Sequence, residues 1–124
     1  MIKVVTRERE GAEKAPTRSY SKKQESQVAK DIGGKRTLNS GATPWQKSDI
    51  LTEQFSIECK TKTTSSKSIS IKKEWIEKLK EESLFMGKNY EALAFNFGPD
   101  EENYFIINTE LFIFLLEQLS KNPL

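Results

Sequence analysis

The apolar residues of this chain cluster after position 50, where two segments have the pattern of strands in a sheet. Residues 55–60 alternate, with Phe55, Ile57 and Cys59 on one face and polar side chains on the other, which is typical of a strand with one buried face. Residues 92–97 are mostly apolar, which indicates an interior strand. A chain of 124 residues has room for one domain and hardly two, so these strands predict one domain with a central sheet.

Helices are expected before, between and after these strands. The first, over residues 21–32, begins with a capping box of Ser21 and Gln24 and ends at a glycine pair. The second spans residues 72–86, and a third lies near the C-terminus. The predicted fold is α/β, with a central mixed sheet flanked by helices in the order αβββαββα and strands over residues 35–38, 48–52, 55–60, 92–97 and 104–108.

The last predicted helix, over residues 109–119 with Thr109 as its cap, is apolar on almost every side. We expect one side of this helix to meet the sheet. Ile113 and Phe114, which lie on its other sides, would then need a second partner.

The N-terminal residues show no clear periodicity. Residues 1–19 mix charges with Gly11 and Pro16, so we expect a flexible arm ahead of a single domain over residues 20–124. The chain starts without the apolar segment of a secretory signal, and no stretch approaches the roughly 18 apolar residues of a membrane-spanning helix. We therefore expect a cytoplasmic protein, and its small size is typical of a prokaryotic or phage source.

The chain has no histidine and a single cysteine, Cys59. The absence of histidine excludes Ser-His-Asp and Cys-His triads, His-dependent nucleases, HExxH metalloproteases and zinc fingers of the Cys2His2 type. A single cysteine excludes internal disulfides and multi-cysteine zinc sites. Any catalysis must therefore use carboxylates, lysine, hydroxyl groups and metal ions.

The charged residues are unevenly distributed along the chain. The net charge of +2 divides into +8 over residues 1–80 and −6 over residues 81–124. This asymmetry favours one face that binds a polyanion and another that is turned away from it. The alternative is a charge gradient without functional meaning.

Three charged residues are expected to meet near the second and third strands. Glu58 and Lys60 are two residues apart on one strand, so they point to the same face, roughly 6.6 Å apart. The short turn at 53–54 favours an antiparallel hairpin, which would bring Asp49 to the same region. Carboxylate oxygens are the ligands that Mg²⁺ prefers, and a lysine beside the ion can orient or deprotonate the water that attacks a phosphodiester. The alternative is an exposed Glu58–Lys60 ion pair, which contributes little to stability.

Glu25 lies on the apolar face of the first predicted helix. It precedes Val28 and Ala29, which are part of the inward stripe, by three and four residues. An inward glutamate is a candidate for a functional role. The alternative is a place at the edge of the stripe in the first turn, where the helix dipole favours a negative charge.

One ordered set of residues carries a family resemblance: Glu25, Asp49 and Glu58-Cys59-Lys60. In its context of helix, three strands, helix and strand, this set resembles the PD-(D/E)XK nuclease superfamily. Within that superfamily the chain looks like the archaeal-type and phage Holliday junction resolvases. The similarity spans about residues 20–108 and includes the turn Ser40-Gly41. The chain departs from the family at Ser48, where a proline is usual, and lacks the Lys-Gly pair often found before the helix glutamate.

The resemblance implies a restriction-endonuclease-like core and a role for each matching residue. Lys60 would position or activate the attacking water, and Ser40 would contact the scissile phosphate. Hydrolysis would leave 5′-phosphate and 3′-hydroxyl ends. The residues that match the family's ligands for Mg²⁺, or for Mn²⁺ as a substitute, are Asp49, Glu58, the backbone carbonyl of Cys59, and Glu25 through water or a second ion.

The resemblance also implies a homodimer that binds branched DNA, because two opposed strands of a four-way junction must be cut. The candidate dimer surface is the apolar final helix with Phe112, Ile113 and Phe114. Recognition of shape rather than of sequence is expected, with salt-dependent contacts to phosphates. The basic residues expected to line the junction are Lys22, Lys23, Lys35, Arg36, Lys47, Lys62 and Lys67.

Two other functions remain open at this point. The chain could be another nuclease of the superfamily, such as a nicking, restriction or end-processing enzyme. A comparison of junction with duplex substrates separates that possibility from a resolvase. A non-catalytic nucleic-acid-binding or assembly module is the third possibility, and it would be favoured by an incomplete acidic set.

Overall fold

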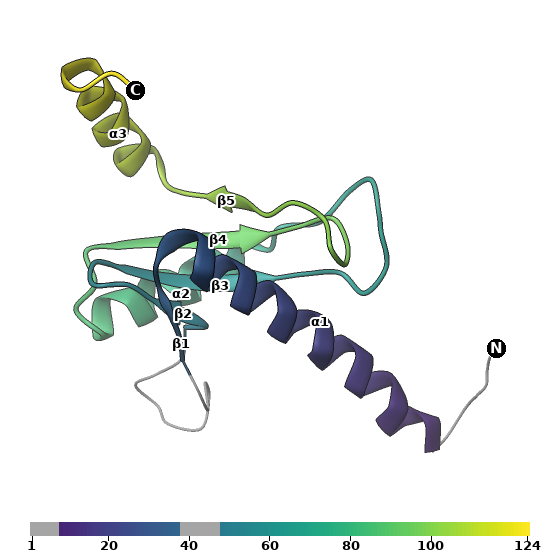
Figure 1. Ribbon diagram of the computed structural model, residues 1–124. Helices are drawn as coiled ribbons and strands as arrows, with labels where there is room; N and C mark the ends of the chain where they lie inside the picture. The colour runs from purple at the N-terminus through teal and green to yellow at the C-terminus, as the bar shows by residue number, and fades with distance from the viewer. Residues whose placement is uncertain (1–7, 38–47) are drawn as a thin grey trace.

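Figure 1 shows the computed structural model of the chain, which describes residues 8–37 and 48–124, with side chains from residue 19 onward. The described residues form helices and strands in the predicted order, and the predicted α/β class with a mixed sheet is confirmed. Along the chain the elements are α1 (Glu8–Ile32), β1 (Lys35–Arg36), β2 (Ile50–Leu51), β3 (Phe55–Lys60), α2 (Lys73–Phe85), β4 (Tyr90–Phe95), β5 (Tyr104–Ile106) and α3 (Thr109–Lys121).

The strands form one sheet in the order β1-β2-β3-β4-β5. β2 and β3 are antiparallel, as predicted, and Thr52 closes the turn between them through backbone and side-chain bonds to Phe55. β4 runs parallel to β3, with Leu93 opposite Glu58. Parallel neighbours need a crossover connection, and α2 provides it.

The first two helices cover opposite faces of the sheet (Figure 1). Because side chains alternate along β3, Ile57 points toward α1, whereas Glu58 and Lys60 point toward α2. On the α2 side, Leu79 and Ser83 are buried. The buried core on the α1 side consists of Val28, Ile50, Ile57, Ala92 and Ala94.

The predicted start of the first helix is wrong. α1 begins at Glu8, so residues 8–19, expected in a flexible arm, continue the helix, and Ser21 lies in its interior. The Ala, Glu, Lys and Arg residues before Ser21 are good helix formers. They allow the helix to begin on the N-terminal side of the capping box. Gln24 is buried, and its side-chain amide donates to the carbonyl oxygen of Lys60 over 2.7 Å, which fastens α1 to the end of β3.

α3 differs from the prediction in its cap and in its contacts. Asn108, not Thr109, is the N-cap, and its side chain accepts a hydrogen bond from the Leu111 N–H. Only Leu111 of this helix is buried, and Phe114 stacks on Tyr90 of β4. The expectation that one side of the helix packs on the sheet is therefore wrong for most of its length, and Figure 1 shows α3 extending away from the sheet. Despite its apolar sequence, neither α3 nor another described helix is long and apolar enough to span a membrane.

Candidate active site

Asp49 directly precedes β2. Its backbone and its side chain both form hydrogen bonds to neighbouring segments of the sheet. Its backbone N–H donates to the carbonyl of Ile57 over 3.0 Å, and its carbonyl accepts from the Thr37 N–H over 2.9 Å. Its Oδ2 accepts from the backbone N–H of Cys59 over 2.8 Å. Asp49 is therefore attached to β3 beside the peptide that joins Glu58 to Cys59.

Glu58 and Lys60 share the face of β3 that α2 covers, as the alternation predicts. Lys60 Nζ lies 3.7 Å from Glu58 Oε2, and the two side chains are only 29% and 25% exposed. The same ammonium group lies 4.4 Å from the centre of the Trp75 ring, on α2. The ion pair and the cation–π contact together hold the lysine over the site.

Burial and neighbouring negative charges disfavour the charged forms of the two carboxylates. Burial raises the pKa of Glu58 to about 8, and the negative charge of Asp49 adds to this effect. Burial also raises the pKa of Asp49 to about 6, although the bond from the Cys59 N–H opposes the change. A bound cation would remove this repulsion, so the donor set has the chemistry of a Mg²⁺ site.

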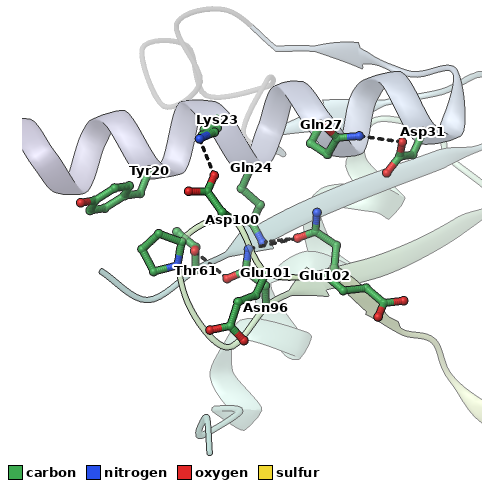
Figure 2. Close-up of a pocket in the computed structure, with 12 residues that line it drawn as sticks. Tyr20, Lys23, Gln24, Gln27, Asp31, Thr61, Asn96, Asp100, Glu101 and Glu102 are labelled. Atoms are coloured by element: carbon green, nitrogen blue, oxygen red, sulfur yellow. Dashed lines mark hydrogen bonds and ion pairs between the residues drawn. The ribbon is translucent and has the colours of Figure 1, made fainter. Parts of the chain in front are cut away.

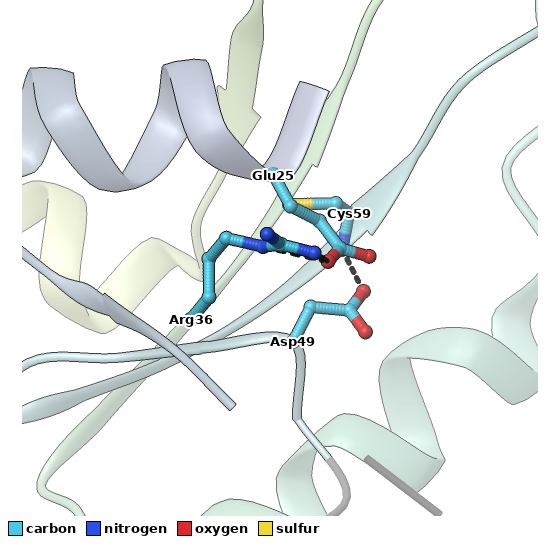
Figure 3. Close-up of polar contacts among 4 residues, drawn as sticks. All are labelled: Glu25, Arg36, Asp49 and Cys59. Carbon is cyan, nitrogen blue, oxygen red and sulfur yellow. Dashed lines mark hydrogen bonds and ion pairs between the residues drawn. The ribbon is translucent and has the colours of Figure 1, made fainter. Parts of the chain in front are cut away.

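Glu25 approaches this region from α1, on the other side of the sheet. Figure 3 shows its carboxylate directed toward Asp49 and Cys59, and paired with Arg36 over 3.3 Å. Its negative charge contributes to the raised pKa of Asp49. Among the described side chains, however, no three acidic or cysteine groups lie close enough together to enclose a metal ion. The structure therefore brings Asp49, Glu58 and Lys60 together and leaves Glu25 nearby in an ion pair.

Cys59 is not a nucleophile candidate. Burial, followed by the charges of Asp49 and Glu25, raises the pKa of its thiol far above the ordinary value. The thiolate form that reactive cysteines need is therefore disfavoured. The sulfur packs against the core on the α1 side, as the alternation of β3 predicts.

The described residues among the predicted DNA contacts differ in exposure and in their partners. Lys22, Lys35 and Lys67 are exposed. Lys23 pairs with Asp100, and Lys62 Nζ donates to the carbonyl of Ser68 over 3.1 Å. Arg36 is engaged with Glu25, as described above. Ser40 and Lys47 lie outside the described residues.

The contribution of α2 to the site was not predicted from the sequence. A hollow of about 200 Å³ lies between β3 and this helix. The α2 side chains that line this hollow are spaced by three and four residues, which places them on one face of the helix. This periodicity could have identified them from the sequence. The lining residues are Glu58, Lys60, Glu74, Trp75, Lys78, Leu79 and Glu82.

A second hollow, of about 350 Å³, lies between α1 and the loop after β4 (Figure 2). A hydrogen-bonded network of Gln24, Asn96, Asn103 and Thr61 lies along it. Its rim carries four carboxylates, which would repel a nucleic acid. These are Asp31, Asp100, Glu101 and Glu102.

The arrangement on the α2 side has the groups for metal-assisted hydrolysis of a phosphodiester. Two carboxylates can hold a divalent cation, and a lysine beside them can orient water. No protein-family model, curated protein or solved structure matches the chain.

Proposed function

We propose that the protein is a Mg²⁺-dependent DNA endonuclease of the PD-(D/E)XK type, with a restriction-endonuclease-like core, that resolves four-way DNA junctions. It would act in recombination or repair in the cytoplasm of a prokaryotic cell or a phage-infected host. The observation that carries the proposal is the meeting of Asp49, Glu58 and Lys60 at the junction of β2 and β3. These residues supply what phosphodiester hydrolysis needs in a chain without histidine.

In this proposal Asp49, Glu58 and the Cys59 carbonyl would hold the cation, and Glu25 would contact it through water. When bound, Mg²⁺ supplies Lewis-acid stabilisation of the phosphate and lowers the pKa of water. Lys60 orients the attacking water and offsets the negative charge that develops on the phosphate. The water oxygen forms a bond to phosphorus, the bond to the 3′ oxygen breaks, and a proton passes to that oxygen. The products are 5′-phosphate and 3′-hydroxyl ends.

The proposal is tested by cleavage of a labelled four-way junction in Mg²⁺, beside a linear duplex with the same arm sequences. We expect paired nicks in the junction and little cutting of the duplex. Cleavage should fall steeply as salt rises, because phosphate contacts release counterions. Equal cutting of both substrates would indicate another nuclease of the superfamily. Tight binding without cleavage, in Mg²⁺ or Mn²⁺, would contradict an enzymatic function.

We also propose that α3 pairs with α3 of a second copy. Six of its apolar side chains are between 42% and 54% exposed, which corresponds to roughly 500 Å² of apolar surface per chain, and apolar patches of about this size are often functional. Four of them, spaced as i, i+3, i+4 and i+7, form an uncharged stripe that can pack against an identical stripe. The stripe consists of Phe112, Leu115, Leu116 and Leu119.

Substitution of a lysine into this stripe is expected to convert the dimer to a monomer. Leu115→Lys places a charge in the apolar contact, where its burial would be strongly unfavourable. Glu117→Lys, at an exposed position on the opposite side of the same helix, is the matched control and should remain dimeric. Sedimentation equilibrium over a range of concentrations measures the change. A wild-type protein that is monomeric throughout would contradict the proposed dimer.

A further inference from the structure

Glu82 lies beside the candidate site, on the face of α2 that covers β3. It follows Leu79 by three residues and Lys78 by four, and Leu79 is buried against the sheet. Glu82 and Glu58 line the same hollow between the helix and the strand. The helix therefore directs a carboxylate to the side of the sheet on which Glu58 and Lys60 lie.

Ser48 connects Glu82 to the turn that carries Asp49. The Ser48 side chain is fully buried, and its hydroxyl donates to Oε1 of Glu82 over 3.4 Å. Ser48 directly precedes Asp49, so the bond orients the α2 carboxylate relative to that residue. The bond requires only an acceptor at position 82, which a glutamine side chain would also provide.

The hollow has more acidic than basic side chains. Three glutamates line it against two lysines, and one of these lysines, Lys60, is already paired with Glu58. Among the described residues, no ion pair joins Glu82 to a lysine or an arginine. A partly buried carboxylate without a counterion is unfavourable unless a cation approaches it.

We infer that Glu82 is a third carboxylate of the cation site, which it contacts through ion-bound water, and that Ser48 is its positioning residue. The inference rests on the proposed function. No three described acidic or cysteine side chains form a group that could hold an ion, so the inference places water between Glu82 and the ion. Mg²⁺ usually keeps several of its waters, so a carboxylate beyond direct contact can still bind the hydrated ion.

The test compares cation binding in the wild-type protein, Glu82→Gln and Glu81→Gln. Mn²⁺ binding is followed by the electron paramagnetic resonance signal of the free ion, and thermal unfolding is measured without cation. We expect Glu82→Gln to bind Mn²⁺ about tenfold more weakly. The same variant should unfold at a higher temperature without cation, because one repulsive charge is removed. Glu81→Gln, on the same helix but exposed and outside the hollow, should match the wild type in both measurements.

Ser48→Ala supplies a second variant, which keeps the charge of Glu82 but removes its hydrogen-bond donor. We expect weaker Mn²⁺ binding with a smaller change than in Glu82→Gln. Equal binding by the wild type and Glu82→Gln, with weaker binding by Asp49→Asn, would overturn the inference and leave the proposed function intact. Loss of both affinity and thermal stability in Glu82→Gln would overturn it as well, because it would indicate a structural role. Absence of cation binding in the wild type would overturn both proposals.

Discussion

Asp49→Asn is expected to lower junction cleavage by roughly 10³-fold and to leave junction binding nearly unchanged. The side chain keeps an oxygen that can accept the hydrogen bond from the Cys59 N–H, so the end of the sheet should hold its geometry. The negative charge that would hold the cation is lost. Single-turnover cleavage measures the chemical step, and a filter-binding or gel-shift titration in Ca²⁺ measures the affinity for the junction.

The matched control for this variant is Glu53→Gln. Glu53 is exposed in the turn between β2 and β3, close to Asp49 in sequence but outside the site. It should cleave like the wild type. Cleavage by Asp49→Asn within a factor of about three of the wild-type rate, with the fold preserved, would remove Asp49 from the proposed cation site.

Glu58→Gln is expected to stabilise the metal-free protein at pH 8. Burial and the charge of Asp49 raise the pKa of Glu58 from 4.5 to about 8, so the folded state holds a proton that the unfolded state has released. The free energy of unfolding of the wild type should therefore fall as the pH rises from about 4.5 to about 8, by a few kcal/mol. Asp49 contributes in the same direction over a lower range, up to about pH 6.

A neutral glutamine removes the contribution of Glu58, so the stability of the variant should change much less above pH 6. Urea unfolding at pH 5 and at pH 8, in the presence of a chelator, measures the difference. Added Mg²⁺ should restore stability to the wild type at pH 8 and have much less effect on Glu58→Gln. A wild type that is equally stable at both pH values would contradict a repulsive pair of carboxylates at this site.

Much of the sheet and part of the candidate site were predictable from local patterns. Alternation along residues 55–60 places Glu58 and Lys60 on one face and Cys59 on the other, because side chains on a strand alternate in direction. The short turn before β3 correctly predicted the antiparallel hairpin with β2. Asp49 was therefore expected near Glu58, and its bond to the Cys59 N–H attaches it beside that residue.

The start of α1 and the contacts of α3 were not predictable in this way. A capping box competes with continued helix, and the helix-forming residues before Ser21 favour continuation in this chain. An apolar helix can be buried against its own sheet or against a second copy of the chain. Its sequence shows which side chains are apolar but not which surface covers them. The described part of the chain buries little of α3 beyond Leu111.

The sequence by itself determined which residues share a face of each strand and which catalytic chemistry the chain cannot use, since periodicity and composition are local properties. Only the tertiary structure decided that β4 lies parallel to β3, that α2 covers Glu58 and Lys60, and that Glu82 lies at the same hollow. These contacts join segments that are separate in the sequence. Which segments meet depends on how the buried surfaces of the whole chain pack together, and no local pattern specifies that choice.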